Sequence, residues 1–132
     1  MLKTRTILIV EDQPIVALEL ADAVSLQGGK VIGPIQTAAH ALEILAARAV
    51  DGAIIDAMLP DGDVTPVGLA LLEKGIPFIV HSGTGMPKEL AAAGPHVPLV
   101  LKPALAERVA DRLAAEMAQS VGFAMSKPAG EG

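Results

Sequence analysis

The sequence predicts an α/β fold of the doubly wound, flavodoxin-like kind, in which five parallel strands in the order 2-1-3-4-5 carry helices on both faces. Short apolar runs alternate five times with segments of helical periodicity, which is the pattern of repeated strand–helix units. The runs are unbroken and aliphatic, as in strands that are buried on both faces. Acidic, hydroxyl and basic residues follow the ends of these runs, where open α/β sheets bind ligands.

The first three strands are expected at residues 7–10, 30–34 and 53–56. Pro34 cannot donate a ladder hydrogen bond, so the second strand is expected at an edge of the sheet. A helix begins near Pro14 and ends at the glycines 28–29, and its expected buried face is Ile15, Val16, Leu18, Leu20, Ala23 and Val24. The next helix has an N-cap at Thr37, runs to about residue 48, and is expected to bury Leu42, Leu45 and Ala46.

The second half of the chain continues the alternation. A third helix is expected at residues 64–74, a strand at 78–80, a short fourth helix at 87–93 and a fifth strand at 97–101. The last helix is expected from 104 to about 118, with an apolar stripe of Leu105, Val109, Leu113 and Met117. The domain therefore spans residues 1–118, and residues 119–132 are expected to form a flexible tail.

The composition excludes several classes of function. The 132 residues correspond to about one domain, and the net charge of -5 argues against nucleic acid or an anionic membrane surface as a partner. The absence of cysteine excludes disulfides, thiol nucleophiles and thiolate metal sites. No apolar run approaches the ~18 residues of a membrane span, and the N-terminus does not read as a signal peptide, so a cytoplasmic protein is expected.

Polar side chains follow four of the five expected strands: Glu11 and Asp12, Asp56, Ser82, and Lys102. In the predicted strand order the three acids share one cleft, where their repulsion raises at least one pKa unless a cation neutralises them. Hard oxygen ligands without His or Cys favour Mg²⁺, with Mn²⁺ as a possibility. Asp56 is then a candidate phosphate acceptor, with Lys102 neutralising the phosphate and Ser82 donating a hydrogen bond to it.

In order and spacing this set resembles the receiver domain of bacterial two-component response regulators, of the stand-alone type: Glu11-Asp12, Asp56 with Pro60 four places on, Ser82, and Lys102-Pro103. The resemblance implies that Asp56 takes a phosphoryl group from a sensor histidine kinase or phosphotransfer protein. It implies that Mg²⁺ is held by Glu11, Asp12, Asp56 and the backbone carbonyl of Met58. It also implies a non-enzymatic protein, monomeric or weakly dimeric, that signals through protein contacts or acts as a phosphate sink.

Two segments resemble one particular group of receiver domains. Residues 31–34 and 77–85 are similar to the second strand and to the Phe-Ala-Thr-Gly-Tyr loop of single-domain receivers of alphaproteobacteria, although His81 and Thr84 replace the Ala and the Tyr. The chain also departs from ordinary receivers, because Leu99 stands where a Tyr or Phe usually moves inward on phosphorylation. We expect the loop 83–85 to reorder instead.

Other interpretations of the same residues remain open. The main alternative is a pseudo-receiver whose protein binding does not depend on phosphorylation, which Leu99 and the short fourth helix favour. An aspartate-nucleophile phosphatase needs an acid at position 58, which is Met58, and a flavin carrier needs a phosphate loop and stacking aromatics that the sequence lacks. His40 is expected to be a solvated helix residue, while His81 either touches the site or points away from it.

Overall fold

The central sheet has five parallel strands in the order β2-β1-β3-β6-β7. This computed structural model describes residues 2–93 and 97–126. The strands of the sheet are β1 (Thr6–Val10), β2 (Lys30–Ile35), β3 (Gly52–Asp56), β6 (Phe78–Ser82) and β7 (Leu99–Leu101). Counted within the sheet this is the order 2-1-3-4-5, so the flavodoxin-like arrangement is confirmed and the strand that carries Pro34 lies at an edge.

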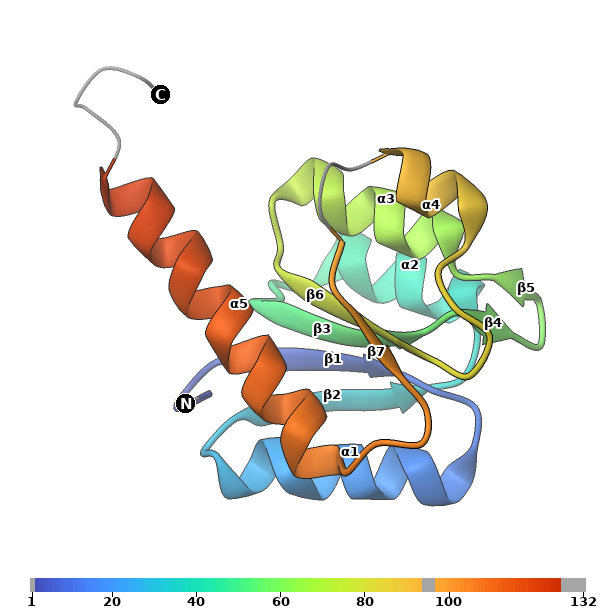
Figure 1. The fold of residues 1–132 in the computed structure, drawn as a ribbon, viewed down its shortest axis with the longest axis horizontal. Helices are drawn as coiled ribbons and strands as arrows, with labels where there is room; N and C mark the ends of the chain where they lie inside the picture. The colour runs from blue at the N-terminus through green and yellow to red at the C-terminus, as the bar shows by residue number, and fades with distance from the viewer. Residues whose placement is uncertain (1, 94–96, 127–132) are drawn as a thin grey trace.

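Helices cover both faces of the sheet (Figure 1). One face carries α1 (Pro14–Leu26) and α5 (Ala106–Ser126), and the other carries α2 (Ala38–Ala47), α3 (Thr65–Lys74) and the short α4 (Lys88–Ala93). Because strand side chains alternate between faces, Ile7 and Ile9 pack with α1 and α5, whereas Leu8 and Val10 pack with α2 and α3. None of the helices in the described ranges is long and apolar enough to cross a membrane.

The helices α3 and α4 approach each other closely at Gly68. A Cβ atom at this position would lie 2.5 Å from Leu90 Cδ1 and 2.7 Å from Leu90 Cδ2. Leu90 is fully buried and is the residue through which the short α4 is anchored in the core. The absence of a side chain at Gly68 therefore allows α4 to pack against α3.

A short antiparallel hairpin that the sequence did not predict follows β3. It consists of β4 (Met58–Leu59) and β5 (Gly62–Asp63), and its turn carries Asp61. The two carboxylate oxygens of Asp61 accept hydrogen bonds from the backbone N–H groups of Ala38 (2.9 Å) and Ala39 (3.0 Å) at the start of α2. Thr37, the predicted N-cap, accepts a bond from His40 N. The start of α2 is thus tied to the hairpin at the carboxyl edge of the sheet.

Several residues that were predicted to lie on buried helix faces are exposed, and those predictions were wrong: Ile15 (73%), Leu18 (62%), Leu42, Ala46, and Leu105, which precedes α5. The helix α1 instead buries Ala17, Leu20, Ala23 and Val24. Apolar residues occupy more than one side of this helix, so their periodicity alone does not define the side that faces the sheet.

The last helix is longer than predicted. It continues to Ser126 rather than ending near residue 118, and its C-terminal part extends beyond the sheet (Figure 1). Residues 119–126 are therefore helical, residues 127–132 lie outside the described residues, and the flexibility of the tail stays a prediction. Gly122 does not end the helix, because one internal glycine costs only about 1 kcal/mol. The strand β7, at Leu99–Leu101, is shorter than the predicted 97–101.

Candidate functional site

Three carboxylates meet at the carboxyl edge of the sheet, as the strand order predicts. Glu11 and Asp12 directly follow β1, and Asp56 is the last residue of the neighbouring strand β3. One oxygen from each of the three lies within 4.8 Å of the others. Glu11 and Asp56 are 1% and 8% exposed, and Asp12 is half-buried. The acids are thus partly withdrawn from water while they face one another.

Lys102 reaches into this acid cluster from the segment that follows β7. Its Nζ atom lies 3.1 Å from Glu11 Oε1 and 3.2 Å from Asp56 Oδ2. Nζ also donates a hydrogen bond of 3.0 Å to Gln13 Oε1. The contact with Gln13 was not predicted from the sequence. The position of Gln13 directly after Glu11-Asp12 was the feature that could have indicated it. The ammonium group therefore neutralises part of the negative charge of two acids from different strands.

The pKa values of Glu11 and Lys102 are both raised, by different causes. Burial raises the pKa of Glu11 to about 7, and the neighbouring Asp56 adds to the shift, while Lys102 and the backbone N–H of Gln13 oppose it. Burial would lower the pKa of Lys102, but Glu11 and then Asp56 hold that pKa above its ordinary value. Lys102 is therefore cationic, and the carboxyl of Glu11 carries a proton for much of the time near neutral pH.

The acid cluster fits a magnesium ion. Its ligand atoms are all carboxylate oxygens, the donors that hard divalent cations prefer. Burial, and then the neighbouring Asp56, disfavour the charged form of Glu11, and a bound cation would favour that charged form. Met58, whose backbone carbonyl is a predicted fourth ligand, lies in β4 with its side chain directed to solvent. The role of that carbonyl stays a prediction.

Ser82, the predicted phosphate contact, is buried at the end of β6. Its Oγ accepts a hydrogen bond of 3.0 Å from Thr84 N and lies 3.2 Å from Thr84 Oγ1. Within the described ranges no hydrogen bond joins Ser82 Oγ to the acid cluster. The hydroxyl of Ser82 is thus engaged by the loop 83–85. From the sequence, Thr84 was considered only as a replacement for Tyr, and this contact was not predicted.

His81 lies beside the acid cluster on the face that carries α1 and α5. It is opposite Asp56 in the register of β3 and β6, and its side chain is 3% exposed. Burial and then the charge of Lys102 lower the pKa of His81, against the effect of Asp56, so the imidazole is neutral. Neither ring nitrogen has a hydrogen-bond partner among the described residues. His40 is exposed on α2, as predicted.

The sequence matches no protein-family model and no curated protein. Solved structures are similar to it. The response regulator receiver domain protein (CheY-like) from Methanospirillum hungatei JF-1 is 18% identical, with a TM-score of 0.80 over 92% of this chain and 99% of that chain. SdrG from Sphingomonas melonis Fr1 is 30% identical, with a TM-score of 0.69 over 92% of this chain and 98% of that chain.

A third structure has a similar fold. It is the receiver domain of the sensor histidine kinase PA1611 from Pseudomonas aeruginosa PAO1, with a magnesium ion coordinated in its active site cleft. It is 17% identical, with a TM-score of 0.74 over 87% of this chain and 98% of that chain.

Proposed function

We propose that this chain, which has the fold of CheY-like response regulator receiver domains, is a single-domain response regulator that accepts a phosphoryl group on Asp56. The observation that carries the proposal is the contact of Lys102 Nζ with Asp56 Oδ2 at 3.2 Å, beside two further acids. The phosphodonor is a sensor histidine kinase or a phosphotransfer protein, and the protein acts in the cytoplasm.

The chemistry is attack of the Asp56 carboxylate on the phosphorus atom of a phosphohistidine. An acyl phosphate bond forms on Asp56, and the P–N bond breaks with the imidazole as the leaving group. Negative charge spreads over the phosphoryl oxygens in the transition state, and Lys102 is close enough to Asp56 to stabilise it. The hydroxyl of Ser82 donates to a phosphoryl oxygen once it leaves Thr84.

The residues that would hold a divalent cation are Glu11, Asp12, Asp56 and the backbone carbonyl of Met58. The bound cation, Mg²⁺ or alternatively Mn²⁺, supplies positive charge that neutralises the phosphoryl oxygens. Glu11 must lose its proton before it can act as a ligand, because a protonated carboxyl is a poor ligand. The cluster therefore exchanges a proton for the cation.

The output is a change of protein contacts, or the protein serves as a phosphate sink, and no external substrate is turned over. The net charge of -5 disfavours nucleic acid as a partner, and we propose a monomer or weak homodimer. The hydrogen bond from Thr84 N to Ser82 Oγ supports a switch in the loop 83–85, since a phosphoryl group that recruits Ser82 would release Thr84. We also propose that residues 77–85 are a variant of the Phe-Ala-Thr-Gly-Tyr loop of alphaproteobacterial single-domain receivers.

A small-molecule phosphodonor with Mg²⁺ tests the proposal. We expect acetyl phosphate to add one phosphoryl group, detected by intact mass and removed by hydroxylamine. Asp56→Asn should abolish the label, whereas Asp22→Asn, the same substitution on the exposed side of α1, should keep it. A folded protein that binds Mg²⁺ but takes no label would instead support the pseudo-receiver, for which Leu99 and the engaged Ser82 are the favouring observations.

A further inference from the structure

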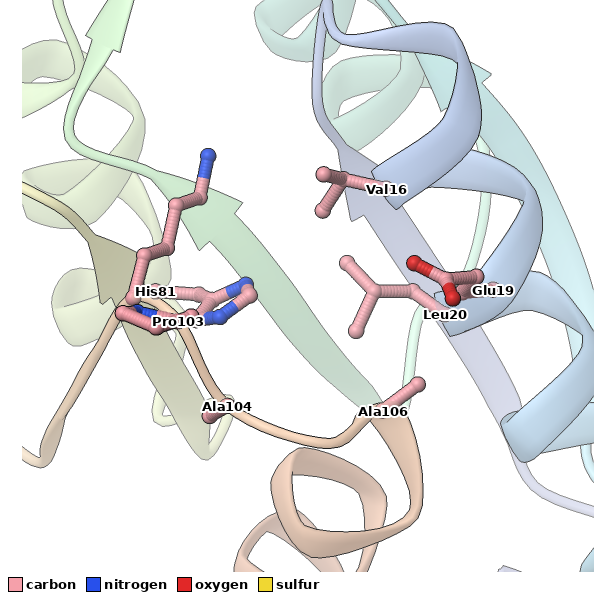
Figure 2. Close-up of a pocket in the computed structure, with 8 residues that line it drawn as sticks. Val16, Glu19, Leu20, His81, Pro103, Ala104 and Ala106 are labelled. Carbon is pink, nitrogen blue, oxygen red and sulfur yellow. The ribbon is translucent and has the colours of Figure 1, made fainter.

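A pocket of about 200 Å³ lies between α1 and the segment that joins β7 to α5 (Figure 2). Its apolar walls are Val16 and Leu20 on α1, and Pro103, Ala104 and Ala106 opposite. A dry, apolar protein cavity of about 150 Å³ holds benzene. The pocket is therefore large enough for one ring with a small substituent.

His81 is a buried polar residue that lines this pocket. Its imidazole extends from β6 into the space between Pro103 and Leu20 (Figure 2). The side chain is 3% exposed, and neither ring nitrogen has a hydrogen-bond partner among the described residues. A neutral imidazole carries one N–H donor and one acceptor nitrogen, and burial of both without partners is unfavourable. The nitrogens are covered in the structure, so the ring must turn toward the pocket to meet a ligand.

The acidic side chains around the pocket disfavour an anionic ligand. Glu19 lines the pocket, and an adjoining groove adds Asp22 and Glu107. These acids disfavour an anion. Lys102 also lines the pocket, but its charge is already paired with Glu11 and Asp56. No further charged side chain within the described part of the chain lines the pocket itself.

We propose that this pocket binds a small neutral ring compound with one hydroxyl group, of the phenol class, whose hydroxyl forms a hydrogen bond with His81. The ring fills the space between the apolar walls, and the hydroxyl supplies the partner that the imidazole lacks. The inference goes beyond the proposed phosphorylation and does not depend on it. Because Lys102 lines the pocket and also contacts Asp56, a bound ligand would lie next to the acid cluster.

Phenol and toluene are a matched pair of probes, since they share the ring and differ in the hydroxyl. In methyl-detected NMR titrations of the full chain, phenol should shift the signals of Val16, Leu20, Ala104 and Ala106 in a saturable manner. Phenol should bind roughly three- to tenfold more tightly than toluene, which is the effect of one hydrogen bond. Absence of saturable shifts at these methyls, or equal affinity for the two probes, would overturn the proposal.

Two variants assign the effect to the pocket and to the imidazole. His81→Leu should remove the preference for phenol over toluene, and a preference that persists in this variant contradicts the role of His81. Ala104→Leu places bulk in the pocket at a half-buried position and should abolish phenol binding, while the remaining methyl signals keep their positions. Phenol binding that survives in Ala104→Leu excludes this pocket, even if His81→Leu does not fold.

Discussion

Binding of Mg²⁺ to the acid cluster should depend steeply on pH, because the cation must displace a proton from Glu11. The pKa of this carboxyl is raised from 4.5 to about 7, chiefly by burial. Below that pKa most molecules carry the proton, and above it most do not. The affinity for Mg²⁺ should therefore rise with pH toward 7 and level off above it.

The size of the effect follows from competition between the proton and the cation at one carboxyl. With a pKa of about 7, the apparent affinity is about tenfold weaker at about pH 6 than its high-pH limit, and it is within about 10% of that limit at about pH 8. A glutamate of ordinary pKa would lose less than about 5% at about pH 6. A tenfold change in affinity corresponds to about 1.4 kcal/mol.

Isothermal titration calorimetry suits this measurement, since the chain has no Trp or Tyr to report binding by fluorescence. Titrations in two buffers of different ionisation enthalpy also count the protons released, which should be about 0.9 per Mg²⁺ at about pH 6 and about 0.1 at about pH 8. Glu11→Gln should bind more weakly with little dependence on pH, and Asp22→Asn should match the unmodified protein. An affinity that changes less than about twofold over this range would refute the assignment of Glu11 as a protonated ligand.

Three further predictions concern stability in urea. Without metal, the stabilising contribution of Glu11 should be lost as the pH rises from 4.5 through about 7, because the raised pKa means that buried Glu11 binds its proton more tightly than the unfolded chain does. The lowered pKa of His81 acts in the opposite direction, so urea titrations of Glu11→Gln beside the unmodified protein, without Mg²⁺, check this. Gly68→Ala should cost about 1–3 kcal/mol, because the new methyl group displaces Leu90, and an unchanged midpoint would show that Leu90 yields freely. Asp61→Ala should lower the midpoint at neutral pH through loss of the α2 caps, and this effect should disappear in acid, where Asp61 is protonated.

The strand order and the meeting of the acids could be predicted because both follow from strong local patterns. Aliphatic runs such as residues 7–10 and 53–56 have few alternatives to strands buried on both faces. Parallel strands end at one edge, so residues that follow them converge irrespective of the loops between them. The contact of Lys102 with Asp56 and Glu11 is the direct result of that geometry.

The features that could not be predicted depend on contacts between segments or on small rotations of a helix. Ile15 and Leu18 are as apolar as the residues that α1 buries, so the exposed side of the helix was misassigned. The hairpin at β4 and β5 and the hydrogen bonds of Asp61 to α2 join parts of the chain that no local pattern relates. The engagement of Ser82 by Thr84 likewise depends on the path of the loop 83–85.

In the proposed function, the position of Lys102 would link protonation, cation binding and phosphate acceptance at one site. In the structure its single charge faces the acid cluster of Glu11, Asp12 and Asp56, and the pKa of Glu11 stays raised, chiefly by burial, despite this charge. A divalent cation adds positive charge, and the pair between Lys102 and Glu11 is then less needed. The ammonium group keeps Asp56 and the neutral Gln13 as partners, from which it can turn to phosphoryl oxygens. On this proposal, release of the Glu11 proton, entry of the cation and readiness of Lys102 for phosphate would be parts of one equilibrium.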